Sequence, residues 1–178
     1  MRRRELIAGA AGLAVAGAGA AVALGGVRPF GDDVDAIAEH ELESIEAPGS
    51  EAGTVTVPRL GTVTLVEVFA TWCGVCSEQM GAMGEAYDAV GGDVQVVSVT
   101  NEPLGRTTTH EDVARWWADH GGRWTVAHDA DLELSRELDA TGVPLSLVLD
   151  ESNVVTWSEL GRKPADELVA AVDDAWGG

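Results

Sequence analysis

The chain has two cysteines, Cys73 and Cys76, in the run Trp72-Cys73-Gly74-Val75-Cys76. A β-branched apolar run precedes this motif and a helical pattern follows it, so both side chains lie on the first turn of a helix and come within disulfide distance. The free N–H groups and the dipole at a helix start stabilise a thiolate. The motif therefore predicts a redox-active disulfide, with Cys73 as the nucleophile of lowered pKa and Cys76 as the shielded resolving thiol.

Metal binding is the other chemistry open to this pair. A zinc site would need two more ligands, and none of the four histidines forms a spaced pair with the cysteines. Copper(I) favours soft thiolate and thioether ligands, and Met80 and Met83 follow closely, although their helical spacing favours core packing. A copper(I)-binding or delivery module using Cys73, Cys76 and a methionine therefore remains the alternative function, and we predict neither a resident metal nor a cofactor.

Two further side chains beside the motif are predicted to take part. Glu67 lies six residues before Cys73, inside the apolar run, where burial raises the pKa of a carboxyl group and suits it to accept the proton of the resolving thiol. The alternative is that Glu67 points to solvent at a strand end. Trp72 is predicted to cover the nucleophile and contact substrate, with ordinary core packing as its alternative.

The elements that position these residues follow from periodicity. Apolar runs at Thr62 to Ala70 and Val94 to Thr100 predict two buried strands. The helical pattern between them, from Ser77 to Val90, ends at Gly91-Gly92, so the three elements are predicted to form a right-handed βαβ unit. The later pattern predicts helices from about residue 107 to 120, 131 to 139 and 164 to 176, and strands at 124–127, 145–149 and 154–159. The predicted fold is α/β, with a mixed central sheet and helices on both faces.

Two motifs that lie far apart in the chain resemble those of the extracytoplasmic TlpA/ResA-type group of the thioredoxin superfamily. Residues 66–76 resemble its active-site strand and turn, Thr141-Gly142-Val143-Pro144 resembles its cis-proline loop, and residues 101–140 resemble its central insertion. The resemblance implies a thioredoxin-like domain over residues 53–178. It also implies that Pro144 packs against the disulfide while Val143 pairs with the substrate backbone. A cis bond before proline costs only about 0.5 to 1 kcal/mol, although an ordinary trans proline at a strand start is the alternative.

The function implied by this resemblance is a thiol-disulfide oxidoreductase that acts on disulfide-containing or dithiol proteins, as a reductase rather than an oxidase, with a membrane electron donor. A peroxidase of the peroxiredoxin type is disfavoured by the paired cysteines. At two places the chain departs from the pattern of the group, so neither the redox preference nor an acid at position 79 is carried over from it. The dipeptide between the cysteines is Gly-Val where thioredoxin has Gly-Pro, and Gln79 stands where some members of the group have a glutamate.

The pattern of the first 30 residues is typical of a targeting segment. Met1 to Arg4 is cationic and Leu6 to Val27 carries no charge, so the segment is predicted to be a twin-arginine-like export signal or, uncleaved, a transmembrane anchor through residues 6–27. Either one places the domain outside the cytoplasm. Residues 31–52 are predicted to form an acidic linker with one helix near Asp33 to Ser44.

Charge excludes one class of partner. The chain has 30 acidic against 11 basic residues, a net charge of -19, and such a surface repels nucleic acid. Only one basic residue, Lys163, is a lysine. Self-repulsion on this scale is tolerable where salt shortens the Debye length, so we predict a halophilic protein.

Overall fold

The computed structural model describes residues 36–176, which form a seven-stranded sheet covered by helices. The strands are β1 (His40–Ser44), β2 (Gly53–Val57), β3 (Thr64–Phe69), β4 (Gln95–Thr100), β5 (Thr125–His128), β6 (Leu145–Leu149) and β7 (Val155–Leu160). The helices are α1 (Gly74–Val90), α2 (His110–Asp119), α3 (Glu133–Glu137) and α4 (Ala165–Ala175). The predicted α/β class and the predicted mixed sheet are both confirmed.

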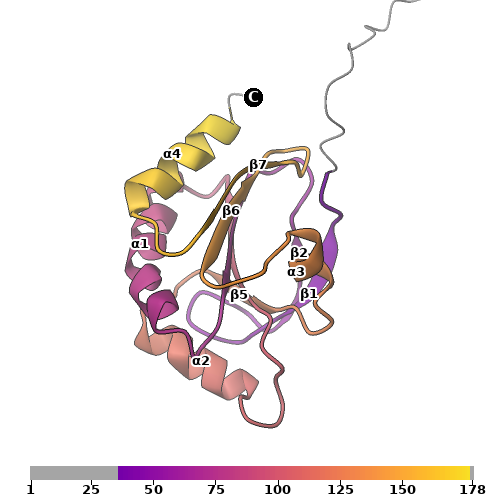
Figure 1. Cartoon of the computed structure of the whole chain (residues 1–178), viewed down its shortest axis with the longest axis vertical. Coiled ribbons are helices and arrows are strands. Elements are labelled where there is room, and N and C mark those ends of the chain that lie inside the picture. Colours follow the sequence, from indigo (N-terminus) through magenta and orange to yellow (C-terminus); the bar gives the residue numbers. More distant parts are fainter. Residues whose placement is uncertain (1–35, 177–178) are drawn as a thin grey trace, which may run out of the picture. The chain divides into compact units, whose positions relative to one another are not determined.

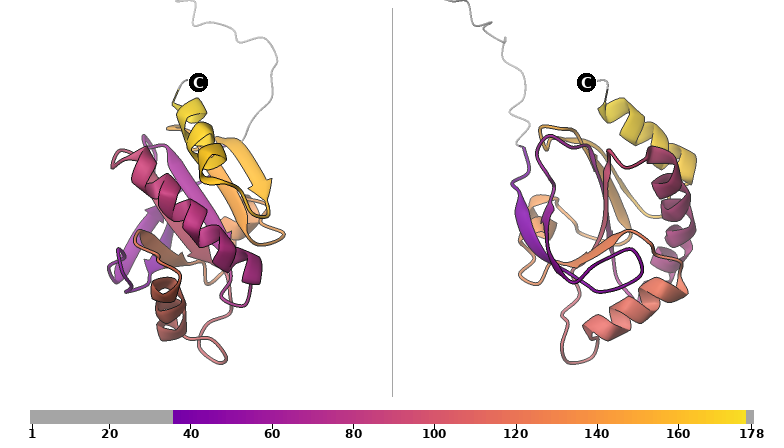
Figure 2. Two further views of the ribbon diagram at one scale, coloured as in Figure 1. Left: turned by 90° about the vertical axis from the view of Figure 1, so that its left-hand side faces the viewer. Right: turned by 180° about the vertical axis from the view of Figure 1, so that it is seen from behind.

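The strand order is β2-β1-β5-β4-β3-β6-β7, so β3 lies inside the sheet. Figure 1 shows the strands between α1 and α4 on one side and the short helix α3 on the other. Strands β3, β4 and β5 run parallel, whereas β6 and β1 pair antiparallel with their neighbours. Helices α1 and α4 pack on one face of the sheet, and α3 lies on the other (Figure 2). The carboxyl ends of β3, β4 and β5 therefore meet at one edge, where α1 begins.

Strand β3 is buried along its whole length, because both of its faces are covered. Its side chains alternate between two apolar clusters. Leu65 and Phe69 join the cluster under α1, α2 and α4, whereas Val66 and Val68 join the one beside α3. Since Glu67 lies between Val66 and Val68, its side chain belongs to the face that α1 covers.

The N-terminal part of the described chain corrects one prediction. His40–Ser44, where the sequence predicts a linker helix, is strand β1, and it pairs with both β2 and β5. Leu42 and Ser44 are buried while Glu41 and Glu43 are exposed, a period of two that the acidic composition conceals. The sheet therefore begins before residue 53, and the segment up to residue 52 is not a linker where the structure describes it.

The predicted export signal or anchor of residues 1–30 lies outside the described residues. Within residues 36–176, every helix is too short or too polar to cross a bilayer.

Candidate active site

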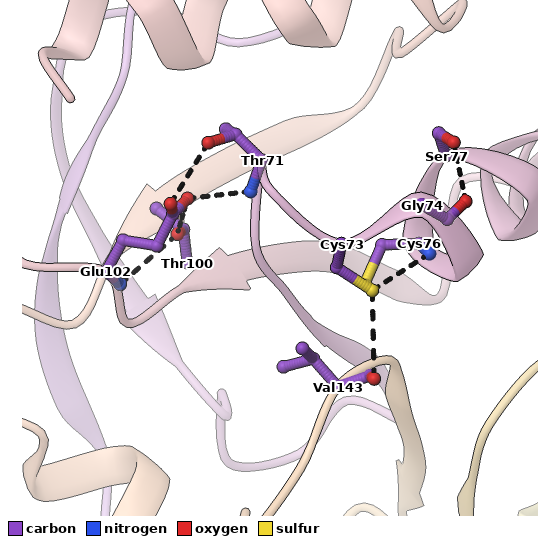
Figure 3. The surroundings of a disulfide bond; sticks show 8 residues. All are labelled: Thr71, Cys73, Gly74, Cys76, Ser77, Thr100, Glu102 and Val143. Atoms are coloured by element: carbon purple, nitrogen blue, oxygen red, sulfur yellow. Dashed lines mark hydrogen bonds between the residues drawn. A yellow bond between two sulfur atoms is a disulfide. The ribbon is translucent and has the colours of Figure 1, made fainter.

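The two cysteines lie where β3 passes into α1. The chain turns after Phe69, with the Cys73 N–H donating to the Ala70 carbonyl at 3.1 Å, and Cys73 is the N-cap residue of α1. Cys73 and Cys76 are joined as a disulfide, with their Cα atoms 5.2 Å apart (Figure 3). The spacing of the motif thus brings the two sulfurs together as predicted.

The helix start gives the two sulfurs different environments. Cys73 Sγ accepts the backbone N–H of Cys76 at 3.1 Å, and the first turn of α1 holds no acidic residue despite the acidity of the chain. An N–H donor and the positive end of the helix dipole both favour a thiolate at Cys73. Cys73 is 8% exposed and Cys76 fully buried, so an incoming disulfide can reach only the first of them.

The loop before β6 packs against this disulfide. Cys73 Sγ lies 3.7 Å from the carbonyl oxygen of Val143, and the Val143–Pro144 peptide bond is cis (Figure 3). In the disulfide this sulfur carries no proton, whereas a reduced Cys73 thiol can donate weakly to that carbonyl. Pro144 is buried and Val143 half-buried. The structure thus places Val143 beside Cys73, with Pro144 following it across the cis bond.

Exposed apolar side chains surround the same place. Trp72 is 74% exposed, which shows that it is not a core residue. Val75, between the cysteines, is 46% exposed, and Leu160 is 57% exposed and lies over Gly142, next to Val143. Sequence patterns gave no reason to single out Leu160, because it ends a strand far along the chain.

Glu67 is fully buried, so the alternative of a solvent-facing carboxyl is wrong. Burial raises the pKa of Glu67 from 4.5 to about 8, partly opposed by the hydroxyl of Ser98, which donates to Oε2 at 3.5 Å. Trp124 Nε1 in turn donates to Ser98 Oγ at 3.0 Å. The carboxyl group thus lies in an apolar core on the α1 side of the sheet, where it can hold or release a proton near neutral pH.

A second carboxylate, Glu102, shapes the turn and was missed by sequence reasoning. Its Oε2 accepts the N–H of Thr71 at 2.7 Å, and its Oε1 accepts the Thr71 hydroxyl at 3.0 Å (Figure 3). Thr100 donates to Oε2 as well, at 3.2 Å. Glu102 follows β4 in a loop, and only the meeting of the β3 and β4 ends brings it to the residues before Cys73.

Three side chains of α1 after the cysteines, Gln79, Met80 and Met83, face the core. Gln79 is buried, and its Oε1 accepts the Lys163 N–H at 2.7 Å, while Nε2 has no hydrogen-bond partner among residues 36–176. Met80 and Met83 are buried in the cluster that contains Cys76. Their packing agrees with their helical spacing.

Comparisons with known proteins agree with this geometry. The Redoxin family model matches residues 43–175. Sporulation thiol-disulfide oxidoreductase A of Bacillus subtilis is 22% identical over 118 residues, covering 66% of this chain and 71% of the relative.

Two solved structures have a similar fold. StoA of Bacillus subtilis superposes with a TM-score of 0.64 at 20% identity, covering 77% of this chain and 98% of that one. The exposed lipoprotein thioredoxin Etrx1 of Streptococcus pneumoniae has a TM-score of 0.64 at 16% identity, covering 77% and 99%. These likenesses show a thioredoxin-like fold, and the family match begins inside β1.

Proposed function

The chain belongs to the Redoxin family and is a thiol-disulfide oxidoreductase of the thioredoxin type, and we propose that it reduces disulfides of protein substrates outside the cytoplasm. The observation that carries this proposal is the position of Cys73. Its sulfur caps α1, accepts the Cys76 N–H and is the more accessible of the pair.

The proposed reaction starts from the reduced dithiol. The Cys73 thiolate attacks one sulfur of the substrate disulfide, forms a mixed disulfide and expels the other substrate sulfur as a thiolate. Cys76 then loses its proton and attacks Cys73 Sγ, which releases the second substrate thiolate and leaves the Cys73–Cys76 disulfide. Two electrons pass from the protein to the substrate, and an electron donor in the membrane is proposed to restore the dithiol.

Glu67 is proposed to accept the proton of Cys76 in the second step. The raised pKa supports this role, because a carboxyl group with a pKa of about 8 is close to the ordinary pKa of a cysteine thiol, about 8.5, and can exchange a proton with it near neutral pH. The Ser98 hydroxyl, held by Trp124, orients one oxygen of the carboxyl group. Glu67 then returns the proton when the disulfide is reduced again.

Substrate binding is proposed at the apolar surface around Cys73. Trp72, Val75 and Leu160 give a protein substrate an exposed apolar contact, while the backbone of Val143 beside the sulfur can align an extended segment. Pro144 holds that backbone in place. Such contacts tolerate many sequences, which suits a reductase of varied proteins.

The proposed location rests on the first 30 residues and on the relatives. A cationic start and an uncharged stretch from Leu6 to Val27 favour export or anchoring, and Etrx1 is an exposed lipoprotein. The mature N-terminus and the membrane or soluble fraction that contains the protein test this location. Recovery of the chain from the cytoplasm with Met1 intact would contradict it.

The direction of electron flow is tested by the reduction potential of the Cys73/Cys76 couple, measured by equilibrating the protein against defined thiol-disulfide buffers. A value near or below about -250 mV supports a reductase, whereas one near about -120 mV would mean a disulfide-forming oxidant. Cys76→Ala, which cannot form the internal disulfide, gives the baseline for the assay. Failure of the native pair to form a disulfide would overturn the proposed function.

A further inference from the structure

Three side chains with metal-binding atoms meet away from the cysteines. One ligand atom each of Glu43, His110 and His128 lies within 4.8 Å of the others. We propose that these residues form a binding site for one divalent transition-metal ion of the zinc type. The site is separate from the redox couple and does not depend on the proposed function.

The fold builds this cluster from three elements. His128 ends β5, and Glu43 of β1 is its direct partner in the antiparallel register, so the two side chains share a face of the sheet. His110 is the first residue of α2, fixed by the capping box of Thr109 and Asp112. The His110 and His128 rings meet edge to face, with centroids 5.6 Å apart and planes at 79°.

The hydrogen bond of His128 prepares it as a ligand. Its Nε2 lies 3.0 Å from the carbonyl oxygen of Glu102, which can only accept, so Nε2 carries the proton. Nδ1 is then left with its lone pair, as in metal-binding histidines whose second nitrogen donates to a backbone carbonyl. His128 is 8% exposed, and Nδ1 has no hydrogen-bond partner within the described residues. A metal ion would satisfy this buried atom.

The other two ligands lie at the surface and can adjust. His110 Nε2 is 3.4 Å from Glu43 Oε2, close to the separation of about 3.3 Å between two ligands of a tetrahedral zinc ion. The side chains are 45% and 61% exposed, so small rotations can close the remaining gap to His128. Glu46 and Glu111 line a surface hollow together with Glu43 and His110, and they add negative charge for a cation.

The donor set selects the class of ion. Two imidazoles and one carboxylate suit zinc and its neighbours in the first transition series, whereas magnesium and calcium prefer oxygen ligands alone. Three protein ligands leave a coordination position for water. The ion would tie β1 and β5 to the start of α2.

The redox site lies nearby in the hydrogen-bond network. The backbone carbonyl of Glu102 accepts a hydrogen bond from His128, and its carboxylate accepts one from the Thr71 N–H. One residue therefore connects the proposed metal site with the turn before Cys73.

Cobalt(II) titration of the full-length chain tests the site, using oxidised, chelator-treated protein in which both cysteines are held in the disulfide. We expect one equivalent to bind per chain, with visible ligand-field absorption and no thiolate-to-metal band. Zinc should displace the cobalt, and magnesium should not. The exposed positions of His110 and Glu43 allow His110→Ala and Glu43→Gln to fold, which far-UV circular dichroism checks.

Each of these two variants should weaken binding by about ten-fold or more. His120→Ala is the matched control and should bind like the native chain, because the His120 ring contacts the Trp116 carbonyl instead. Unchanged affinity in both His110→Ala and Glu43→Gln, an equal loss in His120→Ala, or displacement by magnesium would overturn the proposal. These outcomes do not involve disulfide exchange, so they leave the proposed function standing.

Discussion

Glu67 and Ser146 are direct neighbours across β3 and β6, and each keeps a buried side-chain oxygen without a hydrogen-bond partner among residues 36–176. Ser98 of β4 is the direct partner of Glu67 on its other side. The side chains of Ser146, Glu67 and Ser98 thus form a polar row across β6, β3 and β4, within an apolar core. An ionised carboxylate with so few donors is costly to bury. The folded protein therefore holds the proton of Glu67 more tightly than the unfolded chain does.

Glu67→Gln should change how stability depends on pH. Below about pH 4.5 the carboxyl is protonated in both states, and between that value and its folded pKa of about 8 only the unfolded chain releases the proton. The unfolding free energy of the native chain therefore falls with rising pH across this window, by up to about 1.4 kcal/mol per pH unit, and levels off above it. The glutamine variant lacks this loss. Urea unfolding of both oxidised proteins from pH 5 to pH 9 measures the difference.

The variant should thus gain stability over the native chain as the pH rises. Glu85→Gln, at an exposed position of α1, is the control and should run parallel to the native curve. Parallel curves for Glu67→Gln as well would show that its carboxyl keeps an ordinary pKa in the folded protein.

Removing each cysteine should separate the two steps of exchange. Cys76→Ala keeps the nucleophile and loses the resolving thiol, so it should accumulate mixed disulfides with protein substrates, whereas Cys73→Ala should accumulate none, because its remaining sulfur is fully buried. Non-reducing gels with mass spectrometry of the trapped species give the readout. Equal trapping by both variants would contradict the assigned order.

Trp72→Ala should weaken substrate binding without weakening the fold. A side chain that is 74% exposed contributes little to the core, so the unfolding free energy should change by less than about 0.5 kcal/mol. The KM for a disulfide-containing protein should rise several-fold, since an exposed apolar contact beside Cys73 is lost. Trp176→Ala provides the control, because that tryptophan is 51% exposed near the chain end. The same rise in KM for both variants would argue against a specific role of Trp72.

Glu102→Gln should loosen the turn before the cysteines. The amide can accept only through one atom, so its NH2 group would face one of the donors that Thr71 and Thr100 now present. We expect a loss of about 1 to 3 kcal/mol in unfolding free energy and faster hydrogen exchange of the Thr71 amide. An unchanged exchange rate would mean that other contacts hold the turn.

Salt should stabilise this chain. With a net charge of -19, repulsion between surface carboxylates opposes the compact state, and it weakens as the Debye length falls from about 10 Å at 0.1 M to about 3 Å at 1 M salt. We expect Tm to rise by at least about 5 °C between about 0.1 M and 2 M potassium chloride, a change worth roughly 1 to 2 kcal/mol. A Tm that stays level or falls would contradict the predicted halophilic character.

Sequence reasoning reached the parts of the site that lie close together along the chain. The spacing of Cys73 and Cys76 and the apolar run around Glu67 are local signals, and the structure agrees with both. The roles of Glu102 and Leu160 depend on which strand ends meet, and no local pattern carries that information. For the same reason, the cluster of Glu43, His110 and His128 escaped a search for ligands spaced around the cysteines.

Strand β1 was missed for a different reason. Its exposed face is acidic, so its composition matches a solvated linker, and the strand is recognised by the burial of alternate residues and by its pairing with β2 and β5. A strand of five residues with only two buried side chains gives a weak sequence signal.

The position of β1 matters for anyone who would shorten this protein. A fragment starting at residue 53, the boundary that composition suggests, would lack the strand that separates β5 from β2. It would leave the backbone N–H and C=O groups of β5 open to pairing with another chain, and such unprotected edges promote aggregation. By pairing with β5, the acidic strand β1 thus protects this edge from self-association, and a fragment designed to stay soluble should include it.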